Sequence, residues 1–151
     1  MIYFVTQTFL KDETPITNNV ELTDIYPLVK TSADMWVRYA IGTYFYEYLL
    51  VKYNAQTLSQ DEENLVAIMQ YSIAWRTCSE AVLELSYQLK NKGIQTQSGD
   101  YSNSPETKAI MLMSKHYAQK ADYYDIKLFE YLKENKNLAD FYFAKQSRWN
   151  M

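Results

Sequence analysis

Side chains suited to chemistry are scarce in this chain, which holds one His, one Cys and three Gly among 151 residues. His116 stands alone, so neither a catalytic triad nor a zinc site with two histidines can be built around it. A di-iron bundle uses Glu-x-x-His motifs, but the residue three positions before His116 is Met113. Three Gly are also too few for a phosphate-binding loop of the usual form. We therefore expect no metal, no cofactor and no catalytic residue, and hence no enzyme.

The acids that could form a general acid–base pair lie on a segment that is equally rich in lysine. Asp122, Asp125 and Glu130 share one helical pattern with Lys120 and Lys127. Mixed charges at that density are typical of a solvated helix face. Cys78 lies within an apolar pattern and has no second cysteine to pair with, so we expect a small core residue in a reducing compartment.

The charge balance excludes some partners. The net charge is −3 and no long basic run occurs, so the electrostatic signature of a nucleic-acid binder is missing. The N-terminal run 1–5 has no positive flank, and the apolar stretch 39–53 contains Glu47 and Lys52. We therefore expect neither a signal peptide nor a membrane span, and no membrane partner.

Tyrosine is unusually abundant, with 15 Tyr against 3 Trp and 6 Phe. A phenol ring packs as an apolar body while its hydroxyl seeks water or an acceptor. So many tyrosines suit a subunit that is contacted on several sides. A helical core filled with Tyr in place of Leu is the other interpretation, and the sequence leaves both open.

Helical periodicity dominates the chain, and the fold class it predicts is all-α: a small helical bundle of one domain. The clearest start signal is Ser59-Gln60-Asp61-Glu62, a capping box. A second start is Ser104-Pro105-Glu106, an N-cap followed by Pro at the first helical position. Gly42 marks a break between two earlier helices. The expected segments are an N-terminal arm 1–22, a bundle domain 23–145 with helices 23–41, 43–54, 59–92, 105–136 and 138–145, and a tail 146–151.

Stripes of apolar residues at spacings of three and four indicate which faces are buried. In the first helix the stripe is Ile25, Leu28, Trp36 and Tyr39. The two longest helices carry matching stripes and need each other as partners of similar length. The expected core positions are Trp36, Leu65, Trp75, Val82, Leu85, Tyr117, Tyr124 and Leu128.

Two segments are candidates for contact with other proteins. The extended loop 93–104, between the two longest helices, is polar apart from Ile94 and Tyr101. Long loops in compact bundles are usually functional, so we favour a contact loop over an idle one. At the C-terminus, Arg148 and Trp149 are residue types common in binding hot spots, although this Trp could equally fold back onto the bundle. The candidate contacts are Ile94, Gln95, Asp100, Tyr101, Arg148 and Trp149.

Several short motifs follow one another in an order found in a known family. They are Phe9-Leu10-Lys11, Thr-Pro-Ile-Thr-x-Asn-Val at 14–20, Asp24-Ile25-Tyr26-Pro27, Ile41-Gly42-Thr43 before Tyr44-Phe45, Lys92-Gly93-Ile94, His116-Tyr117-Ala118, and Phe129-x-Tyr131-Leu132-x-x-Asn135. In this order the chain resembles the head–tail connector (adaptor, or neck ring) proteins of tailed bacteriophages, in particular those of the crAss-like group. The resemblance spans most of the chain, and its motifs are short and structural.

The resemblance implies a structural virion protein with the fold already expected. Typically twelve copies form a homo-oligomeric ring that binds the portal protein and offers a platform to tail or stopper proteins. Genomic DNA would only pass through the channel. Such a protein is made in the host cytoplasm and resides in the virion, in the neck between capsid and tail. No catalytic residue is implied. The alternative is a non-virion helical interaction module, either a regulator or an assembly chaperone.

Overall fold

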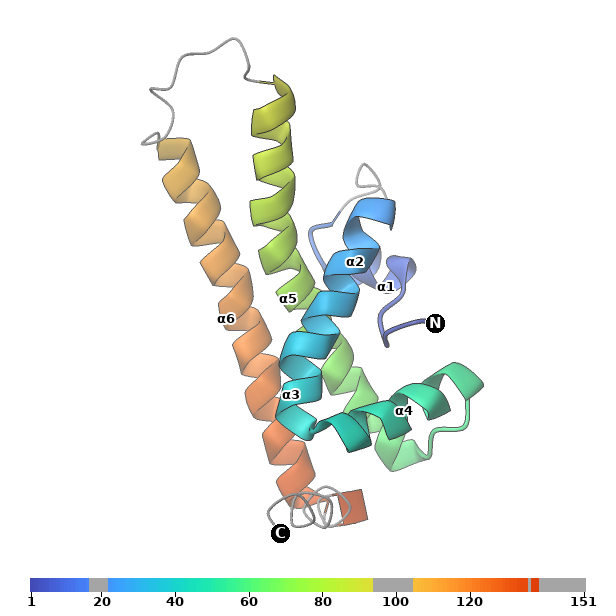
Figure 1. Ribbon diagram of the computed structural model, residues 1–151. Coiled ribbons are helices and arrows are strands. Elements are labelled where there is room, and N and C mark those ends of the chain that lie inside the picture. The colour runs from blue at the N-terminus through green and yellow to red at the C-terminus, as the bar shows by residue number, and fades with distance from the viewer. Residues whose placement is uncertain (17–21, 94–104, 136, 139–151) are drawn as a thin grey trace.

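The computed structural model describes residues 1–16, 22–93, 105–135 and 137–138, and in these residues the fold is all-α, as predicted. The long helices α5 (Gln60–Gly93) and α6 (Pro105–Glu134) run side by side along the molecule (Figure 1). The remaining elements pack around the first half of α5. They are α1 (Gln7–Glu13), α2 (Leu22–Ser32), the π-helix η1 (Ala33–Val37), α3 (Arg38–Ile41) and α4 (Thr43–Ala55).

Local signals place the helix boundaries where the sequence predicts them. At the start of α5, Ser59 Oγ accepts a hydrogen bond from the Glu62 N–H, and Glu62 Oε1 accepts one from the Ser59 N–H. This is the predicted capping box, which satisfies two backbone donors that have no partner inside the helix. Gly42, with φ of 87°, turns the chain sharply between α3 and α4. A residue with a Cβ would be strained at that dihedral angle.

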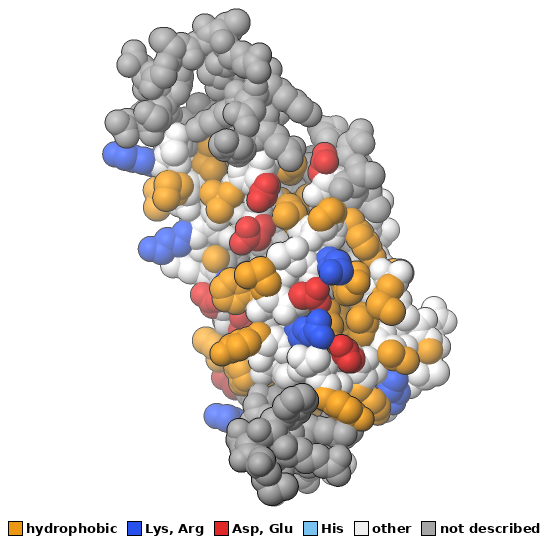
Figure 2. All heavy atoms as spheres, viewed as in Figure 1, with side chains coloured by type: hydrophobic (Ala, Val, Ile, Leu, Met, Phe, Trp, Pro, Cys, Tyr) orange, Lys and Arg blue, Asp and Glu red, His pale blue; other side chains and the backbone are white. Residues whose placement is uncertain are grey.

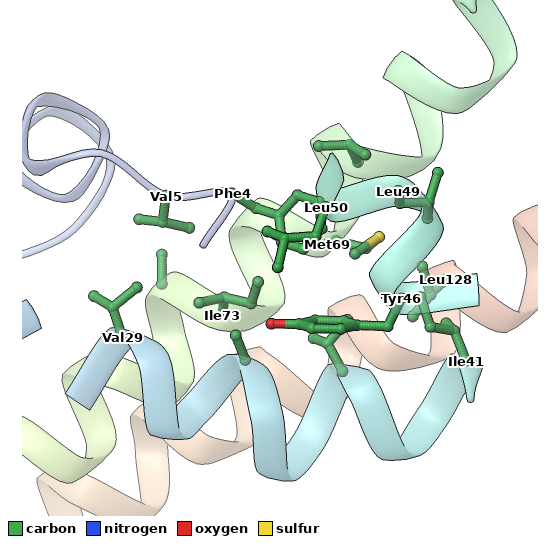
Figure 3. Close-up of a cluster of buried hydrophobic side chains, with 14 of the residues drawn as sticks. Phe4, Val5, Val29, Ile41, Tyr46, Leu49, Leu50, Met69, Ile73 and Leu128 are labelled. Atoms are coloured by element: carbon green, nitrogen blue, oxygen red, sulfur yellow. The ribbon is translucent and has the colours of Figure 1, made fainter. Parts of the chain in front are cut away.

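The N-terminal segment, which the sequence predicts as an arm, lies in the core. Phe4 is fully buried and Val5 nearly so. The Phe4 ring packs edge-on against Tyr46 of α4, with ring centroids 5.5 Å apart, and also contacts Tyr53. Gln70 of α5 donates a hydrogen bond of 2.8 Å to the Phe4 carbonyl. Phe4 therefore lies among Leu50, Met69 and Tyr46, and joins α4 to α5 (Figure 3).

The buried face of the first long helical segment differs from the predicted stripe. Trp36 is 42% exposed and Tyr39 is 88% exposed, so neither is a core residue. The π-helical turn is the physical reason: each turn there takes more residues than an α-helical turn, so a four-residue spacing stays on one face. The buried apolar side chains are Ile25, Val29, Ala33, Val37 and Ile41, spaced by four throughout, and Ser32 beside them is buried as well.

Of the other predicted core positions, Leu65 and Leu128 are fully buried. Five more are only half-buried: Trp75, Val82, Leu85, Tyr117 and Tyr124. Small side chains occupy the seam between α5 and α6 instead, and the large rings flank it. Ser79 and Ser114 exchange hydrogen bonds across this seam, each hydroxyl reaching the carbonyl of the other residue at 2.9 and 3.0 Å. Small residues let the two backbones approach closely, which pushes large rings to the edges of the contact.

Candidate functional site

The six residues predicted as contacts, Ile94, Gln95, Asp100, Tyr101, Arg148 and Trp149, all lie outside the described residues. The described residues contain no cluster of three His, Cys, Asp or Glu that could hold a metal ion. They also contain no helix that is long and apolar enough to cross a membrane. The described surface does carry large apolar side chains in several separate places (Figure 2), and these are the candidate functional site.

The first of these places is the outward side of α4, which we call the α4 stripe: Tyr44, Tyr48, Val51 and Ala55. The spacing of four, three and four residues puts all of them on one side of the helix. Val51 is 63% exposed and Tyr44 is 50% exposed. The opposite side of α4 is already buried in the core. This helix is therefore apolar on two sides, which is typical of a helix that packs against a second partner.

A polar cluster fixes α4, and with it the stripe, to the start of α5. Lys52 Nζ lies 2.6 Å from Glu62 Oε1 and 5.0 Å from the centre of the Tyr48 ring. Burial alone would raise the pKa of the Glu62 carboxyl. The hydrogen bonds from Lys52 and from the Ser59 N–H outweigh burial, so this pKa lies below its ordinary value. Glu62 is therefore ionised at neutral pH and serves at once as helix cap and as partner of Lys52.

The second place is a surface groove of about 420 Å³ along the C-terminal half of α6, which we call the α5–α6 groove. Ile68 of α5 lies on one side, and the groove runs along α6 from Tyr123 to Glu134. Tyr131 donates a hydrogen bond of 2.9 Å to the Asp61 carbonyl at the start of α5. The remaining lining residues are Tyr124, Lys127 and Glu130.

A row of aromatic rings begins in the lining of this groove and continues to α1. The rings of Tyr71 and Tyr124 stack at 5.0 Å with an interplanar angle of 16°. At one end of the row, the Phe9 ring of α1 packs against Tyr71 with ring centroids 5.2 Å apart. At the other end, Tyr123 packs edge-on against Tyr124 with ring centroids 5.1 Å apart. Offset and edge-on ring pairs contribute about 0.5–1.5 kcal/mol each beyond their buried area. The row therefore gives the groove a rigid wall.

A third feature is not an exposed apolar surface but a buried charge, an arginine held between α5, α6 and η1. Arg76 is 5% exposed, and its guanidinium lies 4.0 Å from the centre of the Trp36 ring. Its Nη2 contacts Asp122 and, at 3.0 Å, Asp125 of α6. Asp125 also accepts a hydrogen bond from Ser72. The prediction that the acids of α6 lie on a solvated face is thus partly wrong. Asp125 faces inward and pairs with the buried Arg76, whereas Glu130 is exposed as predicted.

Sequence reasoning missed the α4 stripe, the groove and the buried arginine. The spacing of Tyr44, Tyr48 and Val51 was a visible signal, but the neighbouring Phe45 and Leu49 form an equally good pattern one residue away. Cys78 lies where it was expected: it is buried, and burial raises the pKa of its thiol to about 11. His116 is exposed, and its ring lies beside Tyr117.

Comparison with known families finds a match over most of the chain. Residues 37–148 match a family of unknown function, DUF6712. The chain belongs to that family. The matched residues start in η1 and include α4, α5 and α6, so both apolar surfaces lie within the DUF6712 region. No curated protein and no solved structure matches the chain.

Proposed function

We propose that this DUF6712 protein is a structural virion protein that forms a ring in the phage neck and joins the portal to tail or stopper proteins. The observation that carries the proposal is the spread of large exposed apolar side chains over η1, α4 and α6. Exposed apolar area gathered into patches favours protein contacts. Patches on several elements suit a subunit that touches more than one neighbour.

The resemblance to head–tail connectors supplies the kind of assembly. In a ring of about twelve copies, each subunit would touch two identical neighbours, the portal on one side and tail or other neck proteins on the other. A closed ring needs the same heterologous contact repeated around an axis. The net charge of −3 suits a channel through which genomic DNA passes without sticking. The protein would be made in the host cytoplasm and reside in the virion.

The same exposed surfaces also suit a regulator or an assembly chaperone that never enters the particle. Mass spectrometry of purified virions from a phage that encodes this chain separates the two functions. A ring component is expected at a low, fixed ratio to the major capsid protein. If the chain occurs in infected cells but is missing from purified particles, it is a non-virion interaction module instead.

A loop deletion tests the assembly role within the virion. Replacing residues 93–104 by a tight Gly-Ser turn should leave the chain folded, because α5 and α6 pack along their length. Particles made with this chain should be filled heads without attached tails. A variant with the same loop length and scrambled order is the matched control. Infectious particles from the shortened chain would show that the loop makes no contact the particle needs.

A further inference from the structure

Residues 1–5 lie against the bundle as a bound peptide lies in its receptor. Asn54, near the end of α4, pairs with both main-chain groups of Ile2: its Oδ1 accepts from the N–H, and its Nδ2 donates to the carbonyl, each at 3.0 Å. The same Nδ2 also donates to the Leu50 carbonyl at 2.9 Å, which holds the amide in the orientation that this pairing needs. The Asn54 side chain therefore takes the place that a neighbouring strand has in strand addition.

Two further side chains, each from a different helix, hold the rest of this main chain. Gln70 of α5 donates to the Phe4 carbonyl at 2.8 Å, and the Tyr26 hydroxyl of α2 donates to the Met1 carbonyl at 2.6 Å. Among the described residues, the main chain of 1–5 makes its hydrogen bonds with side chains and none with other main-chain groups. Contacts of this kind recognise an extended segment whether it comes from the same chain or from another.

The ring of Phe4 gives this site its specificity. It is fully buried, with ring centroids 5.5 Å from Tyr46 and 5.3 Å from Tyr53. Figure 3 shows it beside Leu50 and Met69, so α4 and α5 together form an apolar pocket for one aromatic side chain. We call the residues that hold the segment the cradle: Tyr26, Tyr46, Tyr53, Asn54, Met69 and Gln70.

We propose that the cradle of one copy takes residues 1–5 from a second copy, so that neighbouring subunits are joined by exchanged N-terminal segments. This contact rests on the proposed ring and names what builds it. Each subunit offers its segment to the next copy and fills its own cradle from the copy before. Such a contact is heterologous, and it closes into a ring when it is repeated around an axis.

The connection between the cradle and α1 favours exchange. Phe4 has φ of 66°, a left-handed conformation that is disfavoured for a residue with a Cβ. Val5, the next residue, is buried, and Thr6 is already the N-cap of α1. Figure 1 shows the chain bending back between its N-terminus and α1. Short connections under strain favour exchange between copies, because an exchanged segment does not have to fold back onto its own subunit.

A second copy is the occupant that these contacts specify. Its residues 1–5 are identical, so every hydrogen bond and ring contact of the cradle can form again between subunits without a new surface. Because the same contacts form within one chain and between two, the local concentration of cradles decides between the two states. A subunit in dilute solution should keep its own segment. Subunits held side by side in a ring present a neighbouring cradle at an effective concentration of about 1 mM, and these should exchange.

Peptide binding tests whether the cradle accepts the segment from another molecule. In the full chain, Phe4→Ala empties the apolar pocket and leaves the cradle residues unchanged. A synthetic peptide of residues 1–6 should bind this variant in titration calorimetry and raise its unfolding temperature. The same peptide with Phe4→Ala is the matched control and should bind at least about tenfold more weakly. Equal affinities for the two peptides, or an unfolding temperature that neither peptide raises, would overturn the proposal.

A photo-crosslink gives a second measurement that leaves the buried pocket intact. The half-buried Tyr3 ring lies 6.5 Å from the Tyr26 ring of α2, so benzoylphenylalanine in place of Tyr3 reports which chain's α2 lies beside it. Isotope-labelled and unlabelled chains are mixed, incubated and illuminated. Mass spectrometry of the cross-linked peptides then separates bonds within one chain from bonds between two chains.

Cross-links from position 3 to α2 should lie within one chain at about 10 μM protein and increasingly between chains toward about 1 mM. Benzoylphenylalanine in place of Tyr39 is the matched control, because Tyr39 is 88% exposed and lies outside the cradle. It should give no such rise in cross-links to α2 of another chain. Cross-links from position 3 that stay within one chain at every concentration would refute the exchange, as would an equal rise for the control.

Particle analysis separates failure of the exchange from failure of the proposed function. If purified virions contain the chain with position 3 cross-linked only within single subunits, the exchange is wrong and the neck assignment stands. If the chain exchanges its segment in solution but is missing from virions, the exchange stands and the neck assignment is wrong.

Discussion

Replacing Arg76 by Met should destabilise the protein strongly, because this side chain joins three helical segments from a buried position. Met keeps an apolar stem of similar length and removes the charge. The loss leaves Asp125 facing inward without its cation, and it leaves the Trp36 ring without the guanidinium that lies on it.

The size of the expected loss in stability follows from how exposed each partner of Arg76 is. The Asp122 side chain is 62% exposed, so its ion pair contributes about 0–1 kcal/mol. The Asp125 side chain is 22% exposed, and a hydrogen bond between charged groups there contributes about 1.5–3 kcal/mol. The cation–π contact with the half-exposed Trp36 adds about 0.5–1 kcal/mol. The expected loss in the free energy of unfolding is therefore about 2–5 kcal/mol, which is a large part of the stability of a small domain.

Urea unfolding followed by circular dichroism measures this loss as a lower midpoint at unchanged slope. Arg38→Met is the matched control, because Arg38 also pairs with two carboxylates, Asp34 and Glu47, but lies at the surface. It should cost under about 1 kcal/mol. A loss below about 1 kcal/mol for Arg76→Met, or equal losses for the two variants, would refute the reasoning that burial makes the Arg76 contacts strong.

Three further predictions concern the core, the cap and the thiol. Leu128→Ala should lower the free energy of unfolding, measured in urea, by about 2–5 kcal/mol because Leu128 is fully buried. Leu85→Ala should lower it by less, because Leu85 is only half-buried. Equal losses for the two variants would show that burial does not govern the difference. Glu62 has a depressed pKa in the folded state, so its stabilising effect is complete above the ordinary value of 4.5 and is lost as pH falls through the folded pKa. Unfolding measured from pH 6 down to acid should therefore lose more stability for the unmodified chain than for Glu62→Gln, and parallel curves would contradict this. Cys78, buried and with a pKa of about 11, should react with a thiol reagent only as fast as the protein opens, so rapid labelling under native conditions would place it at the surface.

Much of the fold follows from local signals in the sequence. The capping box at Ser59 and Glu62, the break at Gly42 and the start at Pro105 each depend on backbone chemistry within a few residues. Such signals act without tertiary contacts, so the α-helical character and approximate ends of α4, α5 and α6 could be predicted. The short helix α1 and the π-helical turn η1 were not predicted, and the helix expected at 138–145 lies almost wholly outside the described residues. Leu65 and Leu128 were also predictable, since each belongs to the apolar stripe of a long helix.

Only the tertiary structure decided which faces of the helices are used. α5 is surrounded by the N-terminal segment, α2, α4 and α6, so it is buried on several sides and no single stripe describes it. The π-helical turn moved the buried face of the first segment and turned Trp36 outward, onto Arg76. A charged residue in a helical pattern normally predicts a solvated position. Arg76 is buried instead, and its burial depends on Asp125, which is 49 residues away in the sequence. The α4 stripe was visible as a spacing, but its exposure was fixed only when Phe4 of the N-terminal segment and Met69 of α5 packed against the other side of the helix. Periodicity shows that a face is apolar, and the packing of distant segments determines whether that face is buried or exposed.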